Sequence, residues 1–255
     1  MRRLRPAEPV CVECEPANGG VRCERSFEEI GEFVSEGKIV ILKGALAPAA
    51  MLDYREAVMN WGRQTEPFPH GHSPGDSPAL NYHRIDDGAI PSVCPHVFHQ
   101  FGFNTIETLD RHVREPTSRV AKTLCDLQNA IADTRLDLSL IGLRAKVLHY
   151  PAGGGFMAEH THPLEPQRIG LVLSMSQHGT DLTHGATNFV TPEGPVDTTR
   201  EHNIGDVIVF RYDLPHEVTP VDEDAAIDWD SQAGKWSFVL ELRETHRLSH
   251  APPQG

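Results

Sequence analysis

The sequence has few cysteines, a deficit of positive charge and no long apolar run. Five cysteines in 255 residues are too few for a disulfide-dense secreted scaffold. No stretch of about 18 apolar residues occurs, which excludes a predicted transmembrane helix. Lys and Arg total 23 against 36 Asp and Glu, a net charge of −13, so we expect no partner that is a nucleic acid or a membrane.

Glycine, proline and histidine are abundant instead. The chain holds 21 Gly and 20 Pro, which predicts many turns and loops rather than a helical bundle. Its 15 histidines raise the question of a bound metal. The basic N-terminus precedes no apolar segment, so we expect no secretory signal and a reducing, cytoplasmic location.

The first 25 residues show no periodicity, and we predict a mobile or extended arm over 1–25. Cys11, Cys14 and Cys23 could supply three thiolates to zinc, but no fourth ligand is evident. Free thiols in an unstructured arm are the favoured alternative. Residues 26–255 are predicted to form a single domain.

The N-terminal part of that domain, 26–139, has helical patterns. Ser26 and Glu29 form a capping box that predicts a helix ending near Gly37. A short strand is expected over 38–42, and Pro48 marks the first turn of a second helix.

Residues 64–100 contain six prolines and five histidines without a clear period, which predicts a long loop that is either functional or disordered. A third helix is predicted to open at Pro116, with a core-facing stripe of Val120, Leu124, Leu127 and Ile131.

From residue 140 to 245 the pattern changes to short β-branched and aromatic segments. The expected strands cover 141–148, 169–175, 186–190, 207–212 and 236–242. Strands at this spacing, separated by turn residues, indicate a β-sandwich or barrel.

The chemistry is expected at His160 and His162, which follow a glycine-rich turn. In an extended segment, residues two apart point to one face, so both imidazoles can reach the same metal ion. His216, after a separate strand, is the best third ligand. Three ligands from two segments leave coordination positions open for a cosubstrate and dioxygen. By itself, a His-x-His pair is weak evidence for a metal site in a chain with this many histidines.

Six motifs strengthen that interpretation through their order along the chain. They are Tyr150-Pro151 ten residues ahead of His160, then 168–174 (RIGLVLS), 185–189 (GATNF), 205–210 (GDVIVF), 216–221 (HEVTPV) and 234–236 (GKW). In this order the sequence resembles the iron(II)- and 2-oxoglutarate-dependent oxygenases, in particular the prolyl hydroxylases. The resemblance covers about residues 140–245.

The resemblance implies a mainly β fold with flanking helices, a double-stranded β-helix of the jelly-roll or cupin-like type. It implies Fe(II), 2-oxoglutarate and O2 as cofactor and cosubstrates. Oxidative decarboxylation of 2-oxoglutarate would be coupled to oxidation of a substrate, usually by hydroxylation. His160 and His216 would bind iron, Lys235 would pair with the distal carboxylate of 2-oxoglutarate, and Tyr150 would donate it a hydrogen bond.

One position departs from the family pattern: His162 stands where the family has Asp or Glu. It could ligate the metal, which is the favoured alternative. It could also swing away and leave an open position, as in halogenase-type members, or be replaced by Glu165. Lys235 follows His216 by 19 residues, a longer gap than the family shows.

Two rival functions stay open. A cupin-type dioxygenase with three histidines would use no 2-oxoglutarate. A non-catalytic barrel would have lost its reaction together with the acidic ligand.

The substrate is expected to be a small polar or carboxylated molecule, with Asn81, His83 and Arg84 as candidate contacts in the long loop. Hydroxylation, desaturation, cyclisation and halogenation are not separated by motif, and oligomeric state is not predicted.

Overall fold

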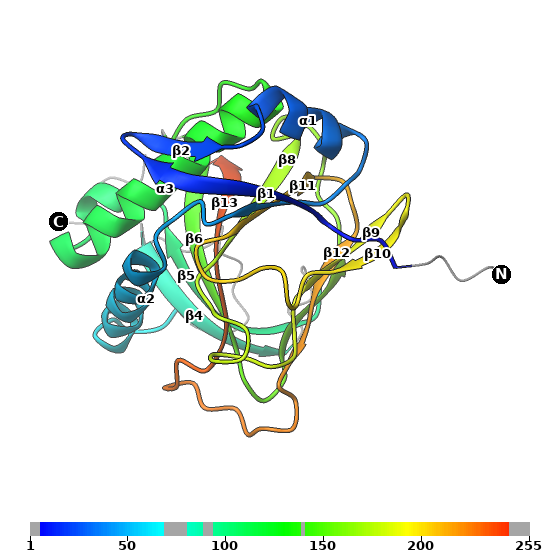
Figure 1. Cartoon of the computed structure of the whole chain (residues 1–255). Coiled ribbons are helices and arrows are strands. Elements are labelled where there is room, and N and C mark those ends of the chain that lie inside the picture. Colours follow the sequence, from blue (N-terminus) through cyan, green and yellow to red (C-terminus); the bar gives the residue numbers. More distant parts are fainter. Residues whose placement is uncertain (1–5, 69–80, 89–93, 139–140, 245–255) are drawn as a thin grey trace.

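The computed structural model describes residues 6–68, 81–88, 94–138 and 141–244, which form a curled β-sheet with helices packed against one side (Figure 1). The strands of the described chain are β1 Val10–Ala17, β2 Gly20–Cys23, β3 Val40–Lys43, β4 Asn81–Gly88, β5 His96–Phe103, β6 Ile141–Pro151, β7 Gly155–His160, β8 Ile169–Ser174, β9 Thr187–Thr191, β10 Gly194–Asp197, β11 Val207–Arg211, β12 His216–Val221 and β13 Gly234–Glu244. The helices are α1 Phe27–Ser35, α2 Pro48–Arg63 and α3 Arg111–Ala132, with a short 3-10 turn η2 Ile106–Thr108.

The strand order explains how the sheet encloses an interior. Neighbouring strands run β10-β9-β12-β7-β5-β6-β13-β8-β11-β3-β1-β2, and β4 pairs with β5. Among the described strands, the four from β10 to β7 therefore join the larger remainder only through the β7–β5 pairing. The predicted mainly β architecture with flanking helices is confirmed, and it has the form of a double-stranded β-helix.

The helices begin where local sequence predicts and bury one face. Ser26 caps α1 by accepting a hydrogen bond from the backbone of Glu29 at 3.2 Å, and Glu29 accepts one in return. The α3 stripe predicted from Val120 to Ile131 is buried. That helix starts earlier than predicted, at Arg111, because Asp110 accepts hydrogen bonds from two first-turn backbone N–H groups.

Helix side chains and the outer face of the sheet form the main core. Trp236 and Phe238 of β13 belong to it, together with Val147 of β6. None of the helices in the described ranges is long and apolar enough to cross a membrane.

The N-terminal segment is part of the sheet rather than a free arm. Strand β1 pairs in parallel with β3 and forms a hairpin with β2. Cys14 and Cys23, opposite each other in that hairpin, form a disulfide. The zinc-thiolate alternative and the alternative of free thiols are therefore both wrong for this pair, whereas Cys11 is free and exposed.

The predicted long loop over 64–100 is wrong where the structure describes it. Residues 81–88 and 96–103 pair as β4 and β5 over eight opposed positions, and β5 also pairs with β6 and β7. Cross-strand partners stabilise these segments despite their poor local strand signal. Residues 69–80 and 89–93 of the predicted loop lie outside the described residues.

Candidate metal centre

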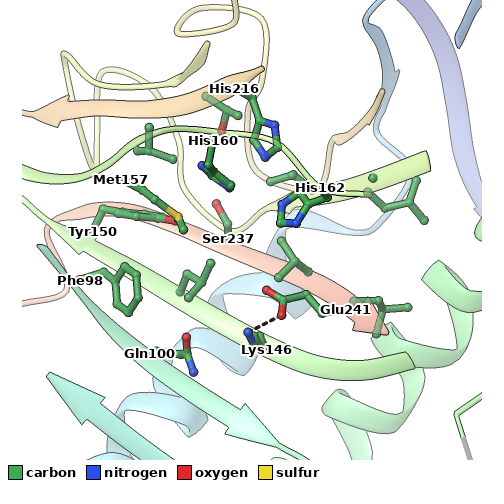
Figure 2. Close-up of a pocket in the computed structure, with 18 of the residues that line it drawn as sticks. Phe98, Gln100, Lys146, Tyr150, Met157, His160, His162, His216, Ser237 and Glu241 are labelled. Carbon is green, nitrogen blue, oxygen red and sulfur yellow. Dashed lines mark hydrogen bonds and ion pairs between the residues drawn. The ribbon is translucent and has the colours of Figure 1, made fainter. Parts of the chain in front are cut away.

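Three histidines converge at the junction of β7 and β12. His160 is the last residue of β7 and His216 the first of β12, and the two are directly opposed in the antiparallel pair. His162 follows two residues after His160. Potential ligand atoms of the three side chains all lie within 4.8 Å of one another. Figure 2 shows the three rings gathered at one side of the pocket.

A tight glycine turn precedes the strand that positions His160 and His162. Gly153 and Gly154, between β6 and β7, adopt φ angles of +100° and +104°. This left-handed region favours glycine because a side chain there clashes with the backbone. The chain can then form a tight loop between β6 and β7, which both run antiparallel to β5, and β7 ends at the site.

Backbone carbonyls orient two of the rings. His160 Nδ1 donates to the carbonyl of Ala158 at 2.9 Å, and His216 Nδ1 donates to that of Leu214 at 2.9 Å. The lone pair of each ring is thereby assigned to Nε2, as is common for metal-binding histidines. Burial, together with the neighbouring His160, lowers the pKa of His216 to about 3, so this imidazole is neutral and able to act as a ligand.

The third ring is held by an aromatic neighbour. His162 stacks on Tyr212, at the end of β11, with ring centroids 4.3 Å apart and planes 12° from parallel. Glu165, the alternative third ligand, lies in an exposed turn and pairs with Arg168 at 3.1 Å. The structure thus brings His162 and not Glu165 to the cluster.

The cluster borders a cavity of about 580 Å³ inside the barrel. The triad occupies one wall, and the facing wall comes from β4, β5, β6 and β13. Residues of that facing wall include Arg84, Phe98, Gln100, Lys146, Leu148, Tyr150, Ser237, Val239 and Glu241.

No protein-family model matches the sequence, and no curated protein matches it significantly. Solved structures do match. A prolyl-4-hydroxylase from Pseudomonas putida superposes with a TM-score of 0.56 at 14% identity, covering 85% of this chain and 98% of that one.

Two further solved structures resemble the fold of this chain. The α-ketoglutarate-dependent non-haem epimerase SnoN of nogalamycin biosynthesis gives a TM-score of 0.57 at 12% identity, covering 90% of each chain. A Trichoplax adhaerens prolyl hydroxylase, in complex with a peptide fragment, gives 0.50 at 12% identity, covering 89% of this chain and 94% of that one. This chain has the prolyl-hydroxylase-like fold of the 2-oxoglutarate–Fe(II) oxygenases. At such low identity the likeness shows the fold alone.

Within this prolyl-hydroxylase-like fold, the donor set fits a first-row divalent metal. Three imidazoles from two strand ends offer nitrogen ligands that suit iron, copper, nickel and zinc. Because the cavity lies beside the cluster, coordination positions on that side can admit small molecules.

Lys235 lies deeper in the barrel than the triad cavity. It lines a separate small space of about 10 Å³ with Ser174, Thr198 and His202, and only 4% of the residue is exposed. Burial lowers the pKa of Lys235 to about 8. Within the described ranges its ammonium has no hydrogen bond or ion pair.

Two residues that line the cavity have buried hydroxyls without a hydrogen-bond partner among the described residues. Ser237 shares a face of β13 with Lys235, two residues further along, and lines the large cavity. Among the described residues, its Oγ and the Oγ1 of Thr187 on β9 are buried without hydrogen bonds. Buried hydroxyls of this kind are available to a ligand.

Tyr150 lines the cavity from β6. Its hydroxyl points toward the sulfur of Met157 at 3.8 Å, and Phe98 packs edge-on against its ring at 5.9 Å. Burial raises the pKa of Tyr150 above its ordinary value, so the phenol remains a neutral hydrogen-bond donor.

The three predicted substrate contacts on β4 have different positions. Asn81 donates to the carbonyl of Thr105 at 3.0 Å and supports the segment leading to η2. His83 points to the outer face, with Nδ1 2.8 Å from His99 Nε2. Arg84 alone lines the cavity, as expected from strand alternation.

Sequence reasoning missed several cavity residues, above all Lys146 and Glu241. In the segment 141–148, Lys146 belongs to the polar set that alternates with apolar residues. Such a polar face usually meets solvent, but in a barrel it meets the enclosed interior. A charged residue on a strand already identified as part of a barrel is therefore the signal that could have found it.

Proposed function

We propose that this protein is a non-haem iron oxygenase that couples decarboxylation of 2-oxoglutarate to the oxidation, most simply the hydroxylation, of a small molecule. The observation that carries the proposal is the convergence of His160, His162 and His216 beside the large cavity. The fold of the structural neighbours agrees with it.

In this proposal His160, His162 and His216 hold Fe(II). When bound, Fe(II) together with 2-oxoglutarate and O2 supplies an oxidant strong enough to attack an unactivated C–H bond. The carbonyls of Ala158 and Leu214 keep two rings in register. Apolar side chains that line the cavity, including Phe98 and Met157, limit the water that reaches the reacting centre.

Lys235 is proposed to bind the distal carboxylate of 2-oxoglutarate. An ammonium buried without a counter-ion is unfavourable in the free protein, and a carboxylate would neutralise it. Ser237, Thr187 and Tyr150 would donate hydrogen bonds along the path from Lys235 to the triad. In the structure Lys235 lies outside the large cavity, so binding requires its side chain or the adjoining wall to shift.

A second candidate is supported by His162 in place of a carboxylate. A three-histidine dioxygenase of the cupin type would let its substrate coordinate the metal directly and would need no 2-oxoglutarate. The two functions share one barrel, so the fold does not separate them. Formation of succinate in the presence of substrate separates the two functions, because only the first consumes 2-oxoglutarate.

The test is anaerobic addition of Fe(II) and then 2-oxoglutarate, followed by visible absorption. We expect a metal-to-cosubstrate charge-transfer band that is absent in His160→Ala and weakened in Lys235→Ala. Loss of the band in His162→Ala identifies that residue as an essential ligand. If the wild-type protein binds iron but forms no band, 2-oxoglutarate is not its cosubstrate and the second candidate gains.

A further inference from the structure

An ion pair lies in the cavity wall that faces the triad. Lys146 of β6 and Glu241 of β13 approach to 2.5 Å, with side chains 7% and 26% exposed. Both line the cavity of about 580 Å³, and Figure 2 shows them on the strands opposite the histidines. The metal centre and the 2-oxoglutarate residues do not account for this pair.

Stability is a poor explanation for these charges. Removing a lysine and a glutamate from water is unfavourable, and apolar residues of similar size often stabilise a protein as well or better. The neighbouring inward position on β13 is apolar, since Val239 stands directly opposite Lys146. A charged pair in such a wall is better explained by a ligand.

Strand register places the pair away from the proposed cosubstrate residues. Lys235 is opposite Tyr150, whereas Lys146 lies four residues earlier on β6. At about 3.3 Å per residue the two levels are separated by roughly 13 Å along the strand. The end of the cavity near Lys146 and Glu241 is therefore left for the substrate.

The balance of charge selects the class of ligand. A ligand with one charge would compete for one member of the ion pair and weaken its contact with the other, which is unfavourable in a largely buried wall. A ligand with adjacent positive and negative groups satisfies both partners at once. Arg84 also lines the cavity, where it pairs with Asp86 at 2.9 Å, a carboxylate that His96 also contacts at 3.2 Å.

We infer that the substrate of the proposed oxygenase is a free amino acid, whose ammonium group binds Glu241 and whose carboxylate binds Lys146. The inference rests on the proposed function for the reaction, but the binding site itself does not depend on it. The amino-acid side chain would extend toward the triad. Residues inside a peptide lack both charges, so the inference distinguishes this protein from a peptide hydroxylase.

The test is calorimetric titration of each of the twenty free L-amino acids, and of its N-acetyl amide, into anaerobic protein loaded with Fe(II) and 2-oxoglutarate. We expect at least one free amino acid to bind and its capped derivative not to bind. Glu241→Gln and Lys146→Met should each weaken that binding by about tenfold or more, because each removes a charge-assisted hydrogen bond. Iron content and thermal unfolding of each variant show that it is folded.

The matched control is an exposed ion pair on α3, Lys122 with Asp126 at 2.6 Å. Lys122→Met should leave amino-acid affinity unchanged. The inference is overturned if no free amino acid binds, if capped derivatives bind equally, or if affinity is unchanged in both cavity variants. Binding that depends on the pair, without a charge-transfer band or succinate, would reject the proposed reaction and keep the amino-acid site.

Discussion

Two clusters of histidines belong to the same barrel, one beside its cavity and one on the outer face of the opposite wall. The inner cluster is His160, His162 and His216, whose ligand atoms converge beside the large cavity. The outer cluster is His83, His99 and His149, none of which lines that cavity. His149 stacks on Trp236 at 4.1 Å, and His99 packs on Phe101 at 4.1 Å.

The comparison shows that the orientation of the rings, not the number of histidines, indicates a metal centre. In the inner cluster, backbone carbonyls bind Nδ1 of two rings and leave Nε2 facing the third ring. In the outer cluster the rings are used as flat aromatic surfaces, and His83 bonds directly to His99 at 2.8 Å. We therefore expect substitutions in the inner cluster to affect metal binding and those in the outer cluster to affect folding.

The largest effect is expected for His216→Ala. Loss of a direct ligand should reduce metal affinity by more than the 10–100-fold typical of changes to supporting residues, and activity should fall to background. Metal content after dialysis measures the loss of affinity, and the rate of succinate formation measures the loss of activity. Full metal retention in this variant would place the metal elsewhere.

In the outer cluster, His149→Ala should leave metal content unchanged and destabilise the fold by about 3 kcal/mol, because it opens a space beside Trp236. Urea unfolding measures the change. A loss of metal without a loss of stability would reverse the roles assigned to the clusters.

The outer cluster also predicts an acid dependence. Burial lowers the pKa of His149 to about 4 and that of His99 to about 3. The unfolded chain binds these protons near pH 6.5, while the folded chain does not. Stability is therefore fully present above pH 6.5 and falls as the pH drops toward 4. His149→Ala should flatten this dependence in urea titrations at pH 7 and pH 5.

Lys235 should show an effect of opposite sign, since it is buried near the cavity and no described residue forms a hydrogen bond or ion pair with its ammonium. Its pKa of about 8 lies below the ordinary 10.5, so the folded state is disfavoured at neutral pH. Lys235→Met should stabilise the protein by about 3 kcal/mol at pH 7. The difference should shrink as the pH rises from 8 to 10.5. A destabilised variant at pH 7 would mean that the lysine is already paired.

The smallest effect is expected at Tyr212, which stacks on His162. Tyr212→Leu should weaken metal binding by about tenfold, as for other residues that orient a ligand, whereas Tyr212→Phe should keep it. Metal titration with a competing chelator measures both variants. Equal affinities for the two would show that the stacking does not position His162.

Local sequence signals predicted the elements that depend on near neighbours. The Ser26–Glu29 capping box and the aliphatic stripe of α3 involve residues that are close in the sequence, so the sequence alone predicts them. The hairpin β1–β2 also has a local signal, Asn18-Gly19, with Gly19 at φ +87°. The prediction of a small-molecule substrate and of a cytoplasmic location stays a prediction.

The sequence by itself determined which histidines could meet, because His160 and His162 are two apart and the order of the six motifs assigns His216 to a separate strand. Only the tertiary structure decided that His162 and not Glu165 joins them, that Lys235 lies deeper than the cavity, and that Lys146 and Glu241 face it. Closure of a barrel turns a polar strand face inward, and that depends on pairings between segments about a hundred residues apart, such as β6 with β13, which no local pattern encodes.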